Sequence, residues 1–167
     1  MADEGGDGTD RVASLVDGVE YVYTVGMDAD EVETRLRAAA TGVLALADDG
    51  RAYAIPVSIH LADGRVYLRL SDEGGEDESR KLAFVETTEE AALVCYGFES
   101  ERESWSVLVE GPLRPVEDAD VDAATVNEEF GPLRVFDEAV DEVELHLYEL
   151  QPTSITGRRT LGTEPEE

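Results

Sequence analysis

The triplet Ser79-Arg80-Lys81 places a hydroxyl and two cations at the predicted start of a short helix, and Lys81 is the only lysine in the sequence. A helix N-terminus offers backbone N–H groups and the positive end of the helix dipole, and both favour an anion. Arginine binds phosphate through two donors, lysine supplies a point charge and serine adds a hydroxyl. The triplet is therefore a candidate phosphate site. The alternative is a solvated group of ion pairs, in which the acidic residues 76–78 neutralise the two cations.

A second candidate is Trp105, the only tryptophan, which lies between Ser104 and Ser106 at the start of a predicted strand. An aromatic ring in this position packs into a core or an interface more often than it contacts a ligand. Together with the basic triplet, however, it stays a candidate ligand contact.

The remaining reactive side chains are few. Cys95 is the only cysteine and lies in the apolar run "AALVCYGF", which predicts a buried, inert thiol. His60 and His146 are far apart in the sequence and could meet at a metal or haem site, but the simpler interpretation is a surface or interface role. No C-x-x-C or H-x-x-x-H spacing occurs, which argues against a structural zinc site.

The elements that must position these residues are mostly short strands. A helix is predicted over 28–40, because Asp28 can cap it and Glu31 completes a capping box. Three strands follow, joined by Asp-Gly turns that are typical of hairpins. Pro56 lies inside the second of these strands and cannot donate to a ladder, which predicts an edge, a bulge or a place where the strand opens.

The later part of the chain also combines helices with short strands. Helices are predicted over 79–86 and 121–129. The predicted strands are 43–47, 52–60, 65–71, 91–98, 104–116 and 143–150. Their order indicates a mainly β fold with peripheral helices, in which six antiparallel strands form a small barrel.

Length and composition predict one domain, over residues 12–159, between disordered acidic tails at 1–11 and 160–167. The 40 acidic residues against 13 basic ones give a net charge of -27. Such self-repulsion destabilises a compact state, but at ~1 M salt the Debye length falls to about 3 Å and the repulsion is screened. We interpret the acid excess as adaptation to a salty cytosol. The alternative is an acidic surface for a basic partner.

The same composition argues against nucleic acid as a partner, because phosphate backbones are bound by clustered lysine and arginine. No apolar run approaches the roughly 20 residues that span a bilayer. The first ten residues are acidic and glycine-rich, unlike a signal peptide. We therefore expect a soluble, cytoplasmic protein.

Several segments in a fixed order carry a family resemblance: "TGVLAL" (41–46), "AYAIPVSIH" (52–60), "SRKLAF" (79–84) and "SWSVLVEGPLR" (104–114). The sequence resembles the FMN-binding split-barrel family of pyridoxamine 5′-phosphate oxidase, and is most similar to its small haloarchaeal members. The resemblance implies a six-stranded antiparallel split β-barrel that forms a homodimer with FMN between the subunits.

The resemblance also implies which residues contact the cofactor. The FMN phosphate would be held by Ser79, Arg80 and Lys81, with Arg69 and Ser71 nearby. The segment Ile55 to Ser58, which includes Pro56 and Val57, would lie beside the flavin ring, and Trp105 and Ser106 would reach the flavin across the dimer interface.

The sequence departs from the oxidases themselves at two places. The stretch "AYAIPVS" lacks their phosphate-binding arginine, for which Arg69 on the next strand is a candidate substitute. No tryptophan follows Trp105, and the ending "SITGRRTLG" lacks their substrate signature. The implied function is an FMN-dependent oxidoreductase with another substrate. The alternatives are an F420-dependent reductase, a non-enzymatic flavin or haem carrier or sensor, and an empty barrel that acts through its dimer surface. No side chain is assigned as catalytic, because a flavin carries the chemistry itself.

Overall fold

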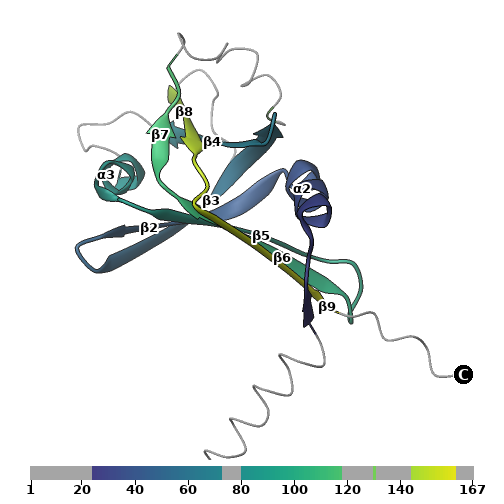
Figure 1. Ribbon diagram of the computed structural model, residues 1–167. Coiled ribbons are helices and arrows are strands. Elements are labelled where there is room, and N and C mark those ends of the chain that lie inside the picture. The colour runs from purple at the N-terminus through teal and green to yellow at the C-terminus, as the bar shows by residue number, and fades with distance from the viewer. Residues whose placement is uncertain (1–23, 73–79, 118–129, 131–143, 161–167) are drawn as a thin grey trace, which may run out of the picture.

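The computed structural model describes residues 24–72, 80–117, 130 and 144–160, which form one antiparallel sheet with two helices (Figure 1). Ser79, most of the predicted tails and the predicted helix over 121–129 lie outside these residues. The elements are β1 (Thr24–Gly26), α2 (Ala29–Ala38), β2 (Thr41–Asp48), β3 (Arg51–Ala62), β4 (Arg65–Asp72), α3 (Arg80–Thr87), β5 (Ala91–Phe98), β6 (Ser104–Gly111), β7 (Leu113–Pro115), β8 (Glu144–Leu150) and β9 (Ser154–Thr160).

The sheet closes into a barrel where two continuous segments cross from one half to the other. The strand order is β1-β9-β6-β5-β2-β3-β4-β8-β7, and β8 runs on into β9 just as β6 runs on into β7. Between these ladders the amide of Gln151 donates to the carbonyl of Pro112 at 3.0 Å. A Cβ atom on Gly111 would lie 1.9 Å from the carbonyl oxygen of Gln151, so only glycine allows the two backbones to cross here.

The two Asp-Gly hairpins are confirmed. Asp49 and Gly50 have φ values of 46° and 77°, and Asp63 and Gly64 have values of 50° and 75°. Positive φ at both central residues is the signature of a type I′ turn, whose twist matches that of the flanking strands. These turns fix the register of β2, β3 and β4.

Pro56 lies where β3 changes partners, which confirms that the strand opens there. β3 pairs with β2 from Arg51 to Ser58 but with β4 only from Ser58 onward. Pro56 therefore has a ladder partner on one side only, and its missing N–H leaves no gap in the β4 ladder.

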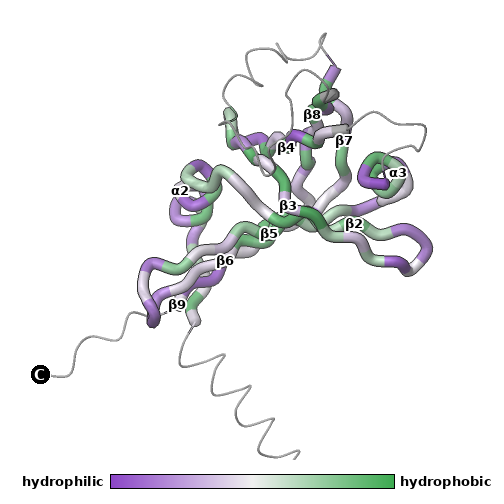
Figure 2. The backbone as a smooth tube through the Cα atoms, turned by 180° about the vertical axis from the view of Figure 1, so that it is seen from behind, coloured by the Kyte–Doolittle hydropathy of each residue, from purple (hydrophilic) through white to green (hydrophobic). Residues whose placement is uncertain are grey.

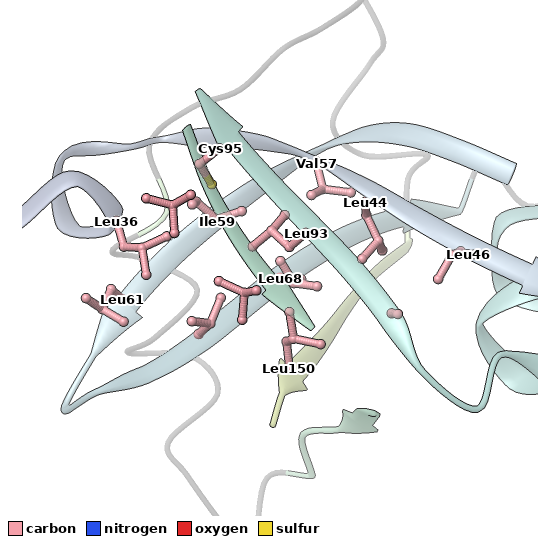
Figure 3. Packing of buried hydrophobic residues seen from close by; sticks show 14 of the residues in the cluster. Leu36, Leu44, Leu46, Val57, Ile59, Leu61, Leu68, Leu93, Cys95 and Leu150 are labelled. Atoms are coloured by element: carbon pink, nitrogen blue, oxygen red, sulfur yellow. The ribbon is translucent and has the colours of Figure 1, made fainter. Parts of the chain in front are cut away.

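The barrel interior is apolar. Leu44, Leu68, Leu93 and Leu150 are completely buried and point toward one another (Figure 3). Cys95 belongs to the same cluster, and burial raises the pKa of its thiol to about 11. The prediction of an inert, buried thiol is confirmed, because the thiolate is the reactive form.

Both helices lie on the inner side of the layer formed by β2, β5, β6 and β9 (Figures 1 and 2). The capping box of α2 is confirmed, since Glu31 donates its amide to Asp28 and accepts the amide of Asp28 in return. Val32 of α2 packs against Gly157 of β9, where a Cβ would lie only 2.7 Å from the valine methyl. The helix thus covers one end of the barrel.

The outer face of five strands is almost free of charge. The register places four residues of each of β2, β3, β5, β6 and β9 on this face. We call this set the uncharged outer face: Thr41, Val43, Ala45, Ala47, Ala52, Ala54, Pro56, Ser58, Ala92, Val94, Tyr96, Phe98, Ser104, Ser106, Leu108, Glu110, Ser154, Thr156, Arg158 and Thr160. Only Glu110 and Arg158 among them are charged, whereas 32% of the whole sequence is charged.

The mainly antiparallel β fold with two peripheral helices is confirmed, but the described residues contain nine strands rather than six. The predicted strand 104–116 is divided into β6 and β7 at Pro112, and β1 and β9 were not predicted. β9 has the sequence "SITGRRT", whose weak apolar alternation gives little local signal. No helix among the described residues is long and apolar enough to span a membrane.

Candidate functional site

Lys81 reaches from α3 to the end of β4. Its Nζ donates to the carbonyl oxygen of Ser71 at 2.8 Å and to the Ser71 hydroxyl at 3.2 Å. An ammonium group has three donors, so these two bonds hold the lysine in place, and the described residues leave its third donor for a ligand. The only lysine of the sequence is therefore held by two hydrogen bonds to one residue of β4.

Three further residues extend this contact into a strip on the outer side of β3 and β4. Ser58 pairs directly with Arg69 across the two strands, and directly paired residues share a face. Ser71 lies two residues beyond Arg69, and Pro56 two residues before Ser58, so all four side chains point the same way. We call Pro56, Ser58, Arg69, Ser71 and Lys81 the outer polar strip.

Arg69 is the second cation of the strip and is half-buried. Its guanidinium carbon lies 5.1 Å from the centroid of the Phe130 ring. Burial lowers the pKa of Arg69, because desolvation penalises the charged form. An anion bound beside it would favour the charged form, so the position suits a phosphate.

Arg80 points away from Lys81, although the two residues are neighbours in α3. Its guanidinium carbon lies 4.9 Å from the centroid of the Tyr53 ring and 5.7 Å from that of Phe84. The two rings stack on each other with centroids 4.8 Å apart. Consecutive helical residues diverge because a turn takes 3.6 residues. The two cations expected to act side by side therefore have separate surroundings.

Three other predicted residues do not join the strip. Val57 is buried in the barrel interior, so only its backbone can face a ligand. Trp105 and Ser106 lie on β6, which is separated from β3 by β5 and β2 (Figure 1).

Trp105 faces the inner side of the sheet rather than the outer side. Its indole covers Gly97, where a Cβ would lie 2.8 Å from the indole nitrogen. The guanidinium of Arg35 in α2 lies 5.2 Å from the ring centroid on that side. Ser106, the next residue, points to the uncharged outer face.

The two histidines do not share a site. His60 pairs with Tyr67 and His146 pairs with Leu70, and positions 67 and 70 of β4 point to opposite faces. His60 instead lies beside Phe130, with ring centroids 5.7 Å apart.

The outer polar strip can therefore bind a phosphate group through an ammonium, a guanidinium and hydroxyl groups. The family model described as pyridoxamine 5′-phosphate oxidase matches residues 28–159, which include every residue of the strip. The chain belongs to this family. Among curated proteins, none matches the sequence.

Several solved structures share the fold of this chain. A FAD-binding protein from Mycobacterium smegmatis is 25% identical, with a TM-score of 0.60 over 81% of this chain and 98% of its own. A FAD-binding protein from Mesorhizobium loti is 16% identical, with a TM-score of 0.62 over 81% and 97%. A FAD- and haem-binding protein from M. smegmatis is 15% identical, with a TM-score of 0.62 over 86% and 76%.

Two features of this oxidase-family chain were not predicted from the sequence. One is the aromatic pair of Tyr53 and Phe84 under Arg80, and the other is Phe130 beside Arg69. These residues are far apart in the chain and only the tertiary fold brings them together. No local sequence signal could have found them.

Proposed function

We propose that the protein binds a flavin nucleotide through its 5′-phosphate at the outer polar strip, with FMN as the smallest such cofactor, and that it acts as an oxidoreductase. The observation that carries this proposal is the contact of Lys81, the only lysine, with Ser71 beside Arg69. The FAD-binding protein from M. smegmatis, at 25% identity, supports a flavin as the ligand.

Each residue of the strip has a distinct task in this proposal. Lys81 donates a hydrogen bond from its third N–H to the phosphate, and Arg69 supplies further N–H donors and a positive charge. Ser71 holds the ammonium in position through its carbonyl and hydroxyl oxygens. Pro56 and Ser58 lie along the flavin. A bound flavin would supply hydride or electron transfer.

We further propose that the protein is a homodimer joined through its uncharged outer face. A face with two charged residues among its twenty positions is unusual in a chain of net charge -27. A second copy offers the same neutral surface, so the two can meet in an isologous contact without burying carboxylates. Ser106 lies on this face, and it, rather than the inward-facing Trp105, is suited to contact the partner's flavin.

The dimer proposal can be tested by placing a charge on this face. In Val94→Glu each subunit would bury a carboxylate at the contact, and we expect monomers by light scattering at a concentration where the wild type is a dimer. Glu99→Gln, which alters an exposed hairpin residue, serves as the control. A dimeric Val94→Glu variant would place the interface elsewhere.

We propose that the substrate differs from that of the oxidases, because this sequence lacks their C-terminal substrate signature. We also propose a cytoplasmic protein adapted to high salt, on the basis of its acid excess. Cofactor binding and turnover are therefore to be measured in molar salt.

The first test is a visible absorption spectrum of the protein purified in molar KCl, followed by chromatography of the cofactor released by heat. We expect a flavin spectrum and release of a flavin 5′-phosphate compound. A colourless protein that also fails to bind added FMN and FAD would contradict the proposal, and F420 would be tested next. Turnover with reduced nicotinamide or reduced F420 separates an enzyme from a carrier.

A further inference from the structure

One row of side chains crosses the uncharged outer face from β3 to β9. The ladder registers place its members directly opposite one another on neighbouring strands. We call them the central row: Pro56, Val43, Val94, Leu108 and Thr156. All five are at least partly exposed. Both helices lie on the other side of the sheet and do not cover the row (Figures 1 and 2). The centre of this face is thus a band without charge that is open to a partner.

The two charges of the uncharged outer face lie on opposite sides of the central row. Glu110 lies two residues beyond Leu108 on β6, and Arg158 lies two residues beyond Thr156 on β9. Because β6 and β9 are antiparallel, the two residues extend in opposite directions from the row. Arg158 donates to the Thr24 hydroxyl at 3.4 Å, and a guanidinium with five donors can bind a carboxylate as well. The face therefore carries opposite charges at matching distances from its centre.

Side-chain size also differs between the two sides of the central row. On the side of Glu110, directly paired positions of β5, β2 and β3 are the small residues Ala92, Ala45 and Ala54. On the side of Arg158, β5 carries Tyr96, of which 61% is exposed. A two-fold rotation about the row exchanges these sides. It would lay each Tyr96 ring over the partner's alanines, in the close packing that an interface core needs.

We infer that the two-fold axis of the dimer runs along the central row and that Glu110 of each subunit pairs with the partner's Arg158. This inference rests on the homodimer of the proposed function and is independent of its cofactor. Residues on the axis meet their own copies, and uncharged residues do so without repulsion. The rotation forms two ion pairs at once. An axis along the strands would instead bring like sides, and with them like charges, together.

A charge swap tests the pairing, with the dissociation constant of the dimer measured by analytical ultracentrifugation in molar KCl. Glu110→Arg and Arg158→Glu each place like charges opposite one another, and we expect each to weaken dimerisation at least about tenfold. The double variant restores both pairs with reversed polarity and should lie within about threefold of the wild type. Glu101→Arg and Arg102→Glu, charge reversals in the exposed β5–β6 hairpin, are the matched controls and should dimerise as the wild type does.

Chemical cross-linking tests the position of the axis separately. Residues on a two-fold axis lie closest to their own copies. Val94→Cys should therefore give covalent dimers with a short bismaleimide, whereas Ala47→Cys, near the β2–β3 turn on the same face, should give none. Cys95 does not interfere, because it is buried and the pKa of its thiol is about 11.

The outcomes separate this inference from the proposed dimer. If the double charge variant stays as weak as the single variants, or if the single variants dimerise as the controls do, the pairing is wrong. If Ala47→Cys cross-links as readily as Val94→Cys, the axis lies elsewhere on the face. Monomers of Val94→Glu would still support the dimer in each of these cases. A monomeric wild type overturns both the inference and the dimer. Circular dichroism checks that each variant is folded.

Discussion

The two helices each carry two cations, but the partners of those cations differ. In α2, Arg35 forms an ion pair with Glu99 of the β5–β6 hairpin, and Arg37 pairs with Glu33 one turn earlier. Both arginines also lie near the helix C-terminus, where the helix dipole favours positive charge. The basic residues of α2 are thus fully explained by the stability of the fold.

In α3 the cations lie in the first turn, where the dipole opposes them. Within the described part of the chain, Lys81 is bonded to neutral oxygens of Ser71, and Arg80 lies on aromatic rings. Neutral partners fix these side chains without cancelling their charge. Basic residues therefore stabilise the fold where carboxylates neutralise them, as in α2. Where neutral groups hold them, as in α3, their charge remains available to an anion.

The largest expected effect that tests this difference is that of Lys81→Ala on flavin binding. Loss of one charge-assisted hydrogen bond, about 1.5–3 kcal/mol, should weaken FMN binding roughly 10- to 100-fold. Equilibrium titration in molar KCl measures it. Arg37→Ala is the control and should bind FMN as the wild type does. Equal loss in both variants would show only a general effect of net charge.

A smaller effect, on stability rather than on binding, is expected for Arg35→Ala. This change removes the ion pair with Glu99 and the contact with Trp105. Such interactions contribute about 0.2–1 and 0.5–1 kcal/mol, which corresponds to a fall in Tm of about 2–6 °C for a protein of this size. Calorimetry and tryptophan fluorescence measure the change. Flavin affinity should stay unaltered, and a large loss of affinity would remove the distinction between the helices.

The cap of α2 offers a test of similar size that involves no cation. Asp28→Ala removes the hydrogen bond that the Glu31 amide donates to the Asp28 carboxylate and should cost about 1 kcal/mol of unfolding free energy. Asp28→Asn should retain most of the stability, because asparagine also caps helices. Denaturant titration of the two variants measures the difference. Equal stability of both variants and the wild type would mean that the end of α2 contributes nothing to folding.

The smallest effect is a pH dependence of the ion pair between α2 and the β5–β6 hairpin. The hydrogen bond from Arg35 lowers the pKa of Glu99, so its ion pair stabilises the fold above the unfolded pKa and loses this effect as pH falls through the folded value. The stability difference between the wild type and Glu99→Gln should therefore shrink as the pH falls below about 4.5, the ordinary glutamate value. Denaturant titrations from pH 7 downward test this. A constant difference would show that Glu99 acts through packing.

Local features of the fold could be predicted from the sequence. The Asp-Gly hairpins and the capping box depend on residues within a few positions of one another, and all were found. β9 was missed because its pairing with β6 spans about a third of the chain and its own pattern is weakly apolar.

The candidate site could be predicted in part for the same reason. The type and position of Lys81 indicated an anion site. Lys81 bonds to Ser71, which the family resemblance had also placed near the phosphate. The direction of Arg80 depends on Tyr53, and the inward orientation of Trp105 depends on Gly97 and α2. Such contacts are set by tertiary packing, which local patterns do not reveal.

The crossing of Gly111 and Gln151 also constrains how the chain can be made. The barrel closes through β8 and β9, which are the last described elements to leave a ribosome. Until they emerge, β2 to β6 can form only an open, curved sheet whose apolar concave side is in contact with water. Domains fold as units, and exposed apolar surface in an incomplete unit promotes aggregation. A truncation before residue 144 would therefore leave a nascent chain that chaperones must protect, rather than a smaller stable domain.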